Sequence, residues 1–262
     1  MGILLSWLNL AEGSAANLAV SSEAAGLGLR AVLTPQISDI WRSTAWGATA
    51  INLRIDLGSA QNLGLVAIAA PRDGLLPSTG ATVRLTADAA TLDGSAALDT
   101  GSQSLGTAMA SFGLWAWASS TLISARYLRL QLTGTASDAY LQLGRLWVGP
   151  ALITTRQASY GYSLGASDPG SNARAPLTGV RDVQRGRPYR TLAFTGDTLT
   201  SAEAAQVEQA ALAAGSTGQV FAARVHTDPA RTGCFGVFSR APTLTRVANA
   251  LWRADFSLEE DL

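Results

Sequence analysis

The sequence predicts a mainly β protein in two parts, a β-sandwich followed by an α+β module with one helix. Short segments that alternate apolar and polar residues recur between turns of Gly, Ser, Asp and Pro. One segment near residue 200 carries a helix-start signal. A chain of 262 residues lies near the upper limit for one core, which favours two domains. With 47% hydrophobic and 15% charged residues, the chain has enough apolar surface to fold.

The first part is predicted to consist of short strands. Residues 51–58 read Ile-Asn-Leu-Arg-Ile-Asp-Leu-Gly, the alternation of a half-buried strand that ends in a turn. The same reasoning predicts strands at residues 63–69, 81–87, 127–133 and 140–148. Residues 87–113 are mostly small and are predicted to be loop with one weak strand. This density of strands favours a sandwich or barrel over residues 1–150.

The second part is predicted to begin with a connection. Residues 153–164 suit a strand or hairpin, and residues 165–176, with two Pro and two Gly, are expected to form an exposed loop or linker. We therefore divide the rest of the chain into a connecting strand and loop at 151–178 and a module at 179–262. A helix is predicted from Thr200, whose hydroxyl forms a capping box with Glu203, to Gly215. Strands are expected at residues 190–194, 218–225, 233–238 and 251–258.

The charge balance argues against a nucleic-acid partner. The 19 basic residues, all arginine, offset 19 acidic ones, so the chain has no long-range field to attract DNA or RNA. A membrane-spanning helix is not expected either, because no stretch of about 18 uninterrupted apolar residues occurs.

Catalytic chemistry is not expected. The single histidine, His226, lies beside Thr227, Asp228 and Pro229, where a turn is predicted, so a surface role is favoured over that of a general base. One His and one Cys, Cys234, do not make an ordinary zinc site. We predict no catalytic residue, no metal and no cofactor. Loop carboxylates could hold a calcium ion, and this alternative stays open. The simpler and favoured interpretation is that these carboxylates are solvated. The residues concerned are Asp39, Asp73, Asp88, Asp93 and Asp138.

The tryptophans are the candidate binding residues. Trp41, Trp46, Trp115 and Trp117 lie in segments predicted to be connections. Indoles in loops at the mouth of a sandwich suit stacking on a sugar ring, which makes these four the candidate glycan-binding residues. The alternative, which is favoured, is that they plug the ends of the barrel, because Trp115 and Trp117 alternate and can share one inward face. Trp147 falls within a predicted strand and is assigned to the core.

The order of elements in residues 3–150 resembles the discoidin-like, galactose-binding-like jelly roll. The residues that carry this resemblance are an early Trp (Trp41 or Trp46), Asp56-Leu57-Gly58 after an apolar strand, the apolar run 63–69, and the Arg-Tyr-Leu-Arg-Leu strand from Arg126. The resemblance implies a β-sandwich jelly roll for residues 1–150. The chain departs from secreted members of the family because it lacks their bridging pair of cysteines.

Residues 179–262 resemble the C-terminal portions of tail proteins of long-tailed phages and gene transfer agents. The resemblance is carried by Leu-Thr-Ser-Ala-Glu at the helix start, Asp228-Pro229 after a strand, and the final Phe-Ser-Leu-Glu-Glu segment. It implies a split-barrel-like module with one helix, packed around the axis of a tail tip.

Two functions follow as expectations. The first is a structural component of a phage-type tail tip, a distal tail or minor tail protein, located in the virion tail tip and made in the bacterial cytoplasm. It would form a homo-oligomeric ring of three or six copies, with the jelly roll outward, and would contact tail tube, tape measure and hub proteins. The second is a carbohydrate-binding adhesin or accessory module whose partner is a cell-surface glycan.

Overall fold

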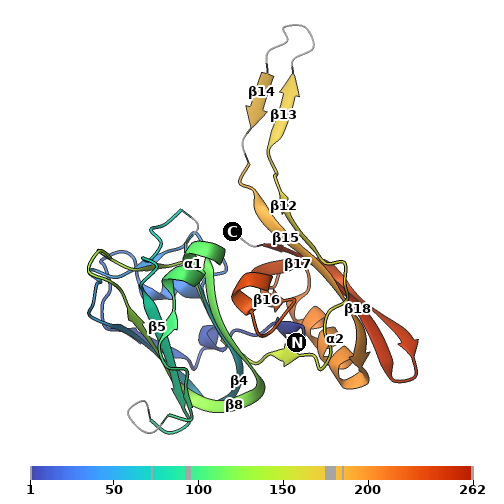
Figure 1. Cartoon of the computed structure of the whole chain (residues 1–262), viewed down its shortest axis with the longest axis horizontal. Coiled ribbons are helices and arrows are strands. Elements are labelled where there is room, and N and C mark those ends of the chain that lie inside the picture. Colours follow the sequence, from blue (N-terminus) through green and yellow to red (C-terminus); the bar gives the residue numbers. More distant parts are fainter. Residues whose placement is uncertain (1, 72, 92–95, 175–180, 185, 261–262) are drawn as a thin grey trace.

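The fold is mainly β, as predicted, and comprises a jelly roll beside a second β-domain with one long helix (Figure 1). The computed structural model describes residues 2–71, 73–91, 96–174, 181–184 and 186–260.

In the described part of the jelly roll there are nine strands and three short helical segments. Its sheet has the strand order β10-β4-β8-β5-β6, with β2 added beside β4 and β7 beside β5, while β3 pairs with β9. The strands are β2 (Asn17–Val20), β3 (Trp41–Arg42), β4 (Ile51–Ala69), β5 (Thr82–Asp88), β6 (Leu98–Asp99), β7 (Gln103–Ser104), β8 (Leu114–Thr133), β9 (Gln142–Leu143) and β10 (Arg145–Gly149). The helical segments are η1 (Leu10–Glu12), η2 (Leu29–Leu33) and α1 (Gly106–Phe112).

The two long strands β4 and β8 form both layers of the sandwich. Their antiparallel register shifts after Asp56 and again after Leu63, so each strand bends and passes from one layer to the other. The first half of β4 pairs with β2, and its second half pairs with β10. The side chains between the two layers form the jelly-roll core, which includes Leu53, Ile68 and Leu130.

The second domain is a seven-stranded sheet with helix α2 packed against it. Its strand order is β11-β1-β16-β17-β18-β15-β12. The strands are β1 (Leu4–Ser6), β11 (Leu152–Ile153), β12 (Ser163–Ser167), β15 (Tyr189–Thr200), β16 (Val220–Ala223), β17 (Gly233–Ala248) and β18 (Leu251–Glu260), and the helices are α2 (Ser201–Ala214) and α3 (Pro229–Thr232). A separate pair, β13 (Ser171–Arg174) and β14 (Arg181–Gln184), extends beyond this sheet.

The jelly roll is inserted into the second domain. Strand β1 pairs with β11 on one side and with β16 on the other, so the chain starts in the second sheet, leaves it to form the jelly roll, and returns beside β1. The sheets thus divide the chain differently from the predicted segments 1–150, 151–178 and 179–262. Residues 4–6, 152–153 and 163–167 all belong to the second sheet, and their pairing partners are too distant in sequence for a local pattern to reveal.

Three segments differ from the sequence-based expectations. Residues 114–133 form one strand, so Trp115 and Trp117 lie in a strand and not in a connection. Residues 163–167 and 171–174, within or beside the predicted linker 165–176, pair as strands, while residues 175–176 lie outside the described residues. Helix α1 forms within the predicted loop 87–113, where Leu105 and Met109 are buried in the jelly-roll core.

A shared apolar core joins the two domains. One face of the β4, β8 and β10 layer contributes Leu65, Leu114 and Trp147, and the second sheet contributes Phe221 and Phe235. The rings of Trp147 and Phe235 lie 6.0 Å apart, and those of Phe221 and Phe235 lie 5.0 Å apart. Neither domain is therefore attached by a flexible linker alone.

Helix α2 begins as the sequence predicts. Thr200 accepts a hydrogen bond from the Glu203 backbone, and the Glu203 carboxylate accepts one from the Thr200 backbone at 2.7 Å. The same carboxylate accepts a bond from the backbone of Thr155 at 2.6 Å. Burial by itself raises the pKa of Glu203, but the hydrogen bonds from Thr200 and Thr155 outweigh it and hold the pKa below its usual value.

We predict that Glu203→Gln lowers the free energy of unfolding at pH 7 by about 1–2 kcal/mol, because an amide loses the charge-assisted bonds. Since the folded pKa of Glu203 is depressed, its contribution is present above the unfolded pKa and is lost as pH falls through the folded value. Urea unfolding between pH 7 and pH 3 should show the two proteins converging in acid. A difference that stays constant over this range would contradict the assignment.

Candidate functional site

Two of the four candidate tryptophans are core residues. Trp41 is 0% exposed and Trp115 is 3% exposed, and both lie in the jelly-roll core. A fully buried indole has no free face for a sugar, so these two side chains fill the sandwich, in agreement with the plugging alternative. Trp147 is buried as predicted, although it belongs to the core between the domains.

The other two candidates are partly exposed and come from different parts of the jelly roll. Trp117 packs against the jelly-roll core from the same strand face as Trp115. Trp46 donates a hydrogen bond from Nε1 to the Leu132 carbonyl at 3.1 Å, and its ring lies so close to Gly134 that a Cβ there would be 2.8 Å away. A role for Trp46 and Trp117 in glycan binding stays a prediction.

Trp46 stands at one end of the sandwich, among loops that we call the loop end (residues 43–50, 70–71, 73–80 and 134–141). Asp138 orders these loops by accepting hydrogen bonds from Ser78 and Thr135. Burial raises the pKa of Asp138, but these bonds outweigh it and keep the pKa below its usual value. The Asp138 carboxylate is therefore buried and used within the fold, which differs from the solvated side chain favoured by the sequence.

His226, considered as a general base, and Cys234, considered as a zinc ligand, both have structural surroundings. His226 Nδ1 accepts a hydrogen bond from the Gly2 backbone at 2.9 Å, and the His226 backbone donates to the Gly2 carbonyl. Cys234 is buried, and burial raises the pKa of its thiol to about 12, far from the thiolate that a nucleophile needs. Within the described ranges, no three His, Cys, Asp or Glu side chains gather where they could hold a metal ion.

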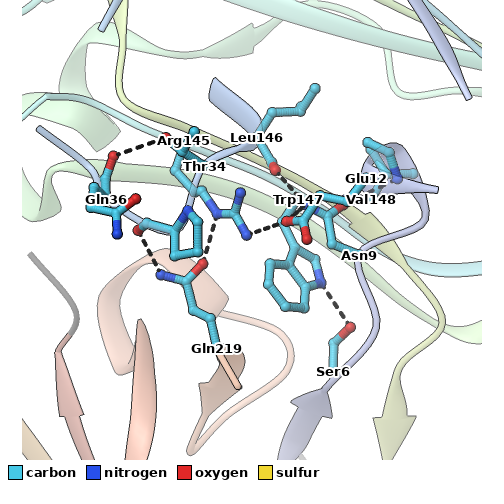
Figure 2. A network of polar contacts seen from close by, with 12 residues as sticks. Ser6, Asn9, Glu12, Thr34, Gln36, Arg145, Leu146, Trp147, Val148 and Gln219 are labelled. Atoms are coloured by element: carbon cyan, nitrogen blue, oxygen red, sulfur yellow. Dashed lines mark hydrogen bonds and ion pairs between the residues drawn. The ribbon is translucent and has the colours of Figure 1, made fainter. Parts of the chain in front are cut away.

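A polar cluster that was not anticipated from the sequence lies at the junction of the domains (Figure 2). Its centre is Arg145 on β10, whose side chain is only 1% exposed. Arg145 Nε donates to Gln219 Oε1 at 2.7 Å, and its Nη2 pairs with Glu12 Oε1. The Gln219 amide in turn donates to the Pro35 carbonyl at 3.0 Å.

Asn9 fixes the carboxylate end of this cluster. Its amide donates to Glu12 Oε1 at 2.8 Å and to the Leu146 carbonyl at 2.9 Å, and its carbonyl oxygen accepts from the Val148 backbone at 3.0 Å. Beside it, the Trp147 indole donates to Ser6 Oγ at 2.9 Å. The cluster therefore joins the start of the chain, β10 and the segment before β16 with directional bonds. No sequence motif could reveal it, because its members are separated by up to about 200 positions.

The comparisons with known proteins give partial structural likenesses only. No protein-family model matches the chain, and no curated protein sequence matches it. The family 32 carbohydrate-binding module of Clostridium perfringens NanJ, solved with galactose, is 14% identical with a TM-score of 0.43, and the match covers 55% of this chain and 98% of that one. A fucose-binding module of Streptococcus pneumoniae is 14% identical with a TM-score of 0.41, covering 54% and 94%. A chitosan-binding module from a Paenibacillus chitosanase/glucanase is 18% identical with a TM-score of 0.42, covering 55% and 98%.

Among the described residues, no helix combines the length and the apolar character needed to cross a membrane.

We predict that Glu12→Ala is more destabilising than Arg145→Met. Removal of Glu12, which is 40% exposed, leaves the buried Arg145 charge without its anion and should lower the free energy of unfolding by about 3 kcal/mol. The double variant Glu12→Ala/Arg145→Met should recover part of that loss, because no buried charge remains. Denaturant unfolding of the three variants measures both effects, and a double variant no more stable than Glu12→Ala would contradict the explanation.

Proposed function

We propose that the protein is a non-catalytic structural component of a multi-subunit assembly, of the phage-type tail-tip kind, in which the jelly roll is mounted rigidly on the second domain. In this proposal the subunits form a ring of three or six copies around the tail axis and contact tail tube, tape measure and hub proteins. The observation that carries the proposal is a β-ribbon that projects from the second domain.

This ribbon, the β-arm, consists of β12, β13, β14 and the described residues 168–170 and 186–188. Strand β12 is the edge of the seven-stranded sheet, and β13 and β14 pair with each other beyond it. Figure 1 shows the ribbon pointing away from both domains. The four residues of β13 alone extend the ribbon by about 10 Å at the rise of an extended strand, where a neighbouring subunit can contact it.

The β-arm and the segment just before it expose four large apolar side chains. Tyr160 and Tyr162 precede β12, Leu164 lies on it, and Val183 lies on β14; Tyr160 is 102% exposed and Leu164 59%. A two-stranded ribbon is marginally stable alone in water, and an edge strand with exposed apolar side chains is a site where other chains pair or pack. These properties support a contact with another subunit of an assembly.

The purified protein is expected to be an oligomer of three or six 27.1 kDa protomers by multi-angle light scattering. Tyr160→Ser combined with Leu164→Ser should weaken association at least tenfold, because both side chains lose their apolar contact surface. Leu212→Ser, on the exposed side of α2, is the matched control and should leave the mass unchanged.

A wild-type protein that remains monomeric at high concentration contradicts the assembly role. The tail-tip assignment has its own test, electron microscopy of particles made without this protein. Tails with an intact tip would contradict that assignment even if the protein forms a ring.

A second candidate function is carbohydrate recognition by the jelly roll. It is favoured by the surroundings of the partly exposed Trp46 at the loop end. Two further partly exposed side chains, Arg42 and Tyr140, belong to this end of the jelly roll. The Arg42 guanidinium lies 5.0 Å from the centre of the Tyr140 ring, so these two side chains form a small polar and aromatic surface. Aromatic rings beside hydrogen-bond donors suit the alternating apolar and hydroxyl surfaces of a glycan.

For this second function we expect the full chain to bind members of a glycan array and Trp46→Ala or Tyr140→Ala to lose at least tenfold in affinity. Leu122→Ala, an exposed residue on the bulged part of β8, is the control. A glycan signal that is equal in all three variants would place recognition elsewhere, and no signal for the wild type would favour a purely architectural jelly roll.

A further inference from the structure

The junction cluster lines a groove between the two domains on the side of helix α2. We call it the junction groove; its volume is about 420 Å³, and the residues that matter here are Trp7, Asn9, Glu12, Arg145, Trp147 and Gln219. Both domains contribute, because Glu12 and Arg145 come from the jelly-roll side and Gln219 follows α2. Ligand pockets occur preferentially at such domain boundaries, and this volume is at the small end of their usual range.

One wall of the junction groove is aromatic. Trp7 packs against the core of the second domain and remains partly exposed, so its indole has one supported side and one side accessible from the groove. An indole held in this way offers a flat apolar surface at little cost in side-chain entropy.

The lining of the junction groove also offers fixed polar groups. The Glu12 side chain is 40% exposed, and its Oε1 is occupied by Arg145 and Asn9. Because 40% of the side chain stays exposed, part of the Glu12 carboxylate can be reached by a hydroxyl group of a ligand. The carboxylate is already held by Arg145 and Asn9, which means that a ligand would meet a preorganised acceptor.

This pairing of a supported indole with fixed polar groups matches the chemistry of a sugar. A pyranose ring presents a face of C–H groups to an aromatic ring and a rim of hydroxyls that donate and accept hydrogen bonds. Arg145 balances the charge of Glu12, but Arg145 is buried and Glu12 is partly exposed. The group that a ligand meets in the groove is therefore the carboxylate. An anionic sugar would therefore face a like charge, whereas a neutral one would donate to it.

We infer that the junction groove is a binding site for a neutral hexopyranose, either free or as the terminal unit of a glycan. The inference goes beyond the assembly role and shares with the second proposed function only the class of ligand. It places that ligand between the domains, away from the loop end.

The test uses the full chain and saturation-transfer NMR with galactose, glucose, fucose and N-acetylglucosamine, together with galacturonate as the anionic counterpart of galactose. Ala213 is an exposed residue of the groove lining near the end of α2. The substitution Ala213→Phe is designed to fill the groove without disturbing the core. Ala205→Phe adds the same side chain at an exposed position of the same helix outside the groove lining and is the matched control.

We expect at least one neutral sugar to bind, with affinity reduced at least tenfold in Ala213→Phe and in Trp7→Ala but unchanged in Ala205→Phe. Galacturonate should bind at least tenfold more weakly than galactose if galactose is among the binders. Binding that survives Ala213→Phe overturns the inference, as does a wild-type protein that binds none of the four sugars. Binding lost in Trp46→Ala and retained in Ala213→Phe overturns the junction site while supporting carbohydrate recognition at the loop end.

Discussion

The layer formed by β10 and the adjoining halves of β4 and β8 is buried on both faces, and the arrangement of the whole molecule depends on this. Its inner face, with Val66, Ile68 and Trp115, packs inside the jelly roll. Its outer face, with Leu65, Ala67 and Trp147, packs on the second sheet. A layer with two apolar faces requires cover on both sides, because exposed apolar surface of that extent is unfavourable in water. The second domain is therefore part of the folding unit of the jelly roll. The two chain segments that connect the domains, around Leu8 and Gly149, also pack closely, because a Cβ on Gly149 would lie 2.1 Å from the Leu8 carbonyl oxygen.

The same constraint is visible within the single strand β4. Residues 51–57 alternate apolar and polar side chains because one face of that half is exposed, whereas residues 63–69 form a nearly continuous apolar run because both faces are buried. Both halves were predicted as strands from these patterns, and the local signals of Thr200, Glu203 and Gly215 predicted helix α2. The continuity of the second run was also a signal that something covers its outer face. The sequence could not identify the cover, since Phe221 and Phe235 lie more than 150 positions away.

What the sequence could not predict is non-local. Strand β1 has no internal signal that it pairs with β16, because sheet partners are chosen by the tertiary fold. The alternation of Trp115 and Trp117 correctly suggested a shared inward face, yet their segment was assigned to a connection, whereas it forms part of β8. The junction groove draws its residues from four separate stretches of chain, around residues 7–12, 35, 145–147 and 213–219, so no spacing rule applies to it. Counting aromatic residues directed attention to the loop end, although much of that aromatic surface is structural.

The buried arginine has a role that an apolar side chain would not fill. Two apolar sheet faces can pack in more than one relative position, because the hydrophobic effect is not directional. The bonds from Arg145 to Glu12 and Gln219 are directional, and they connect residues of both domains at one edge of the shared core. We interpret the ion pair as a device that selects one packing register at some cost in stability, a use of buried polar groups known from other folds. A single register is what both proposals need: it fixes the direction of the β-arm relative to the jelly roll, and it keeps Glu12 and Trp7 at a constant separation across the junction groove.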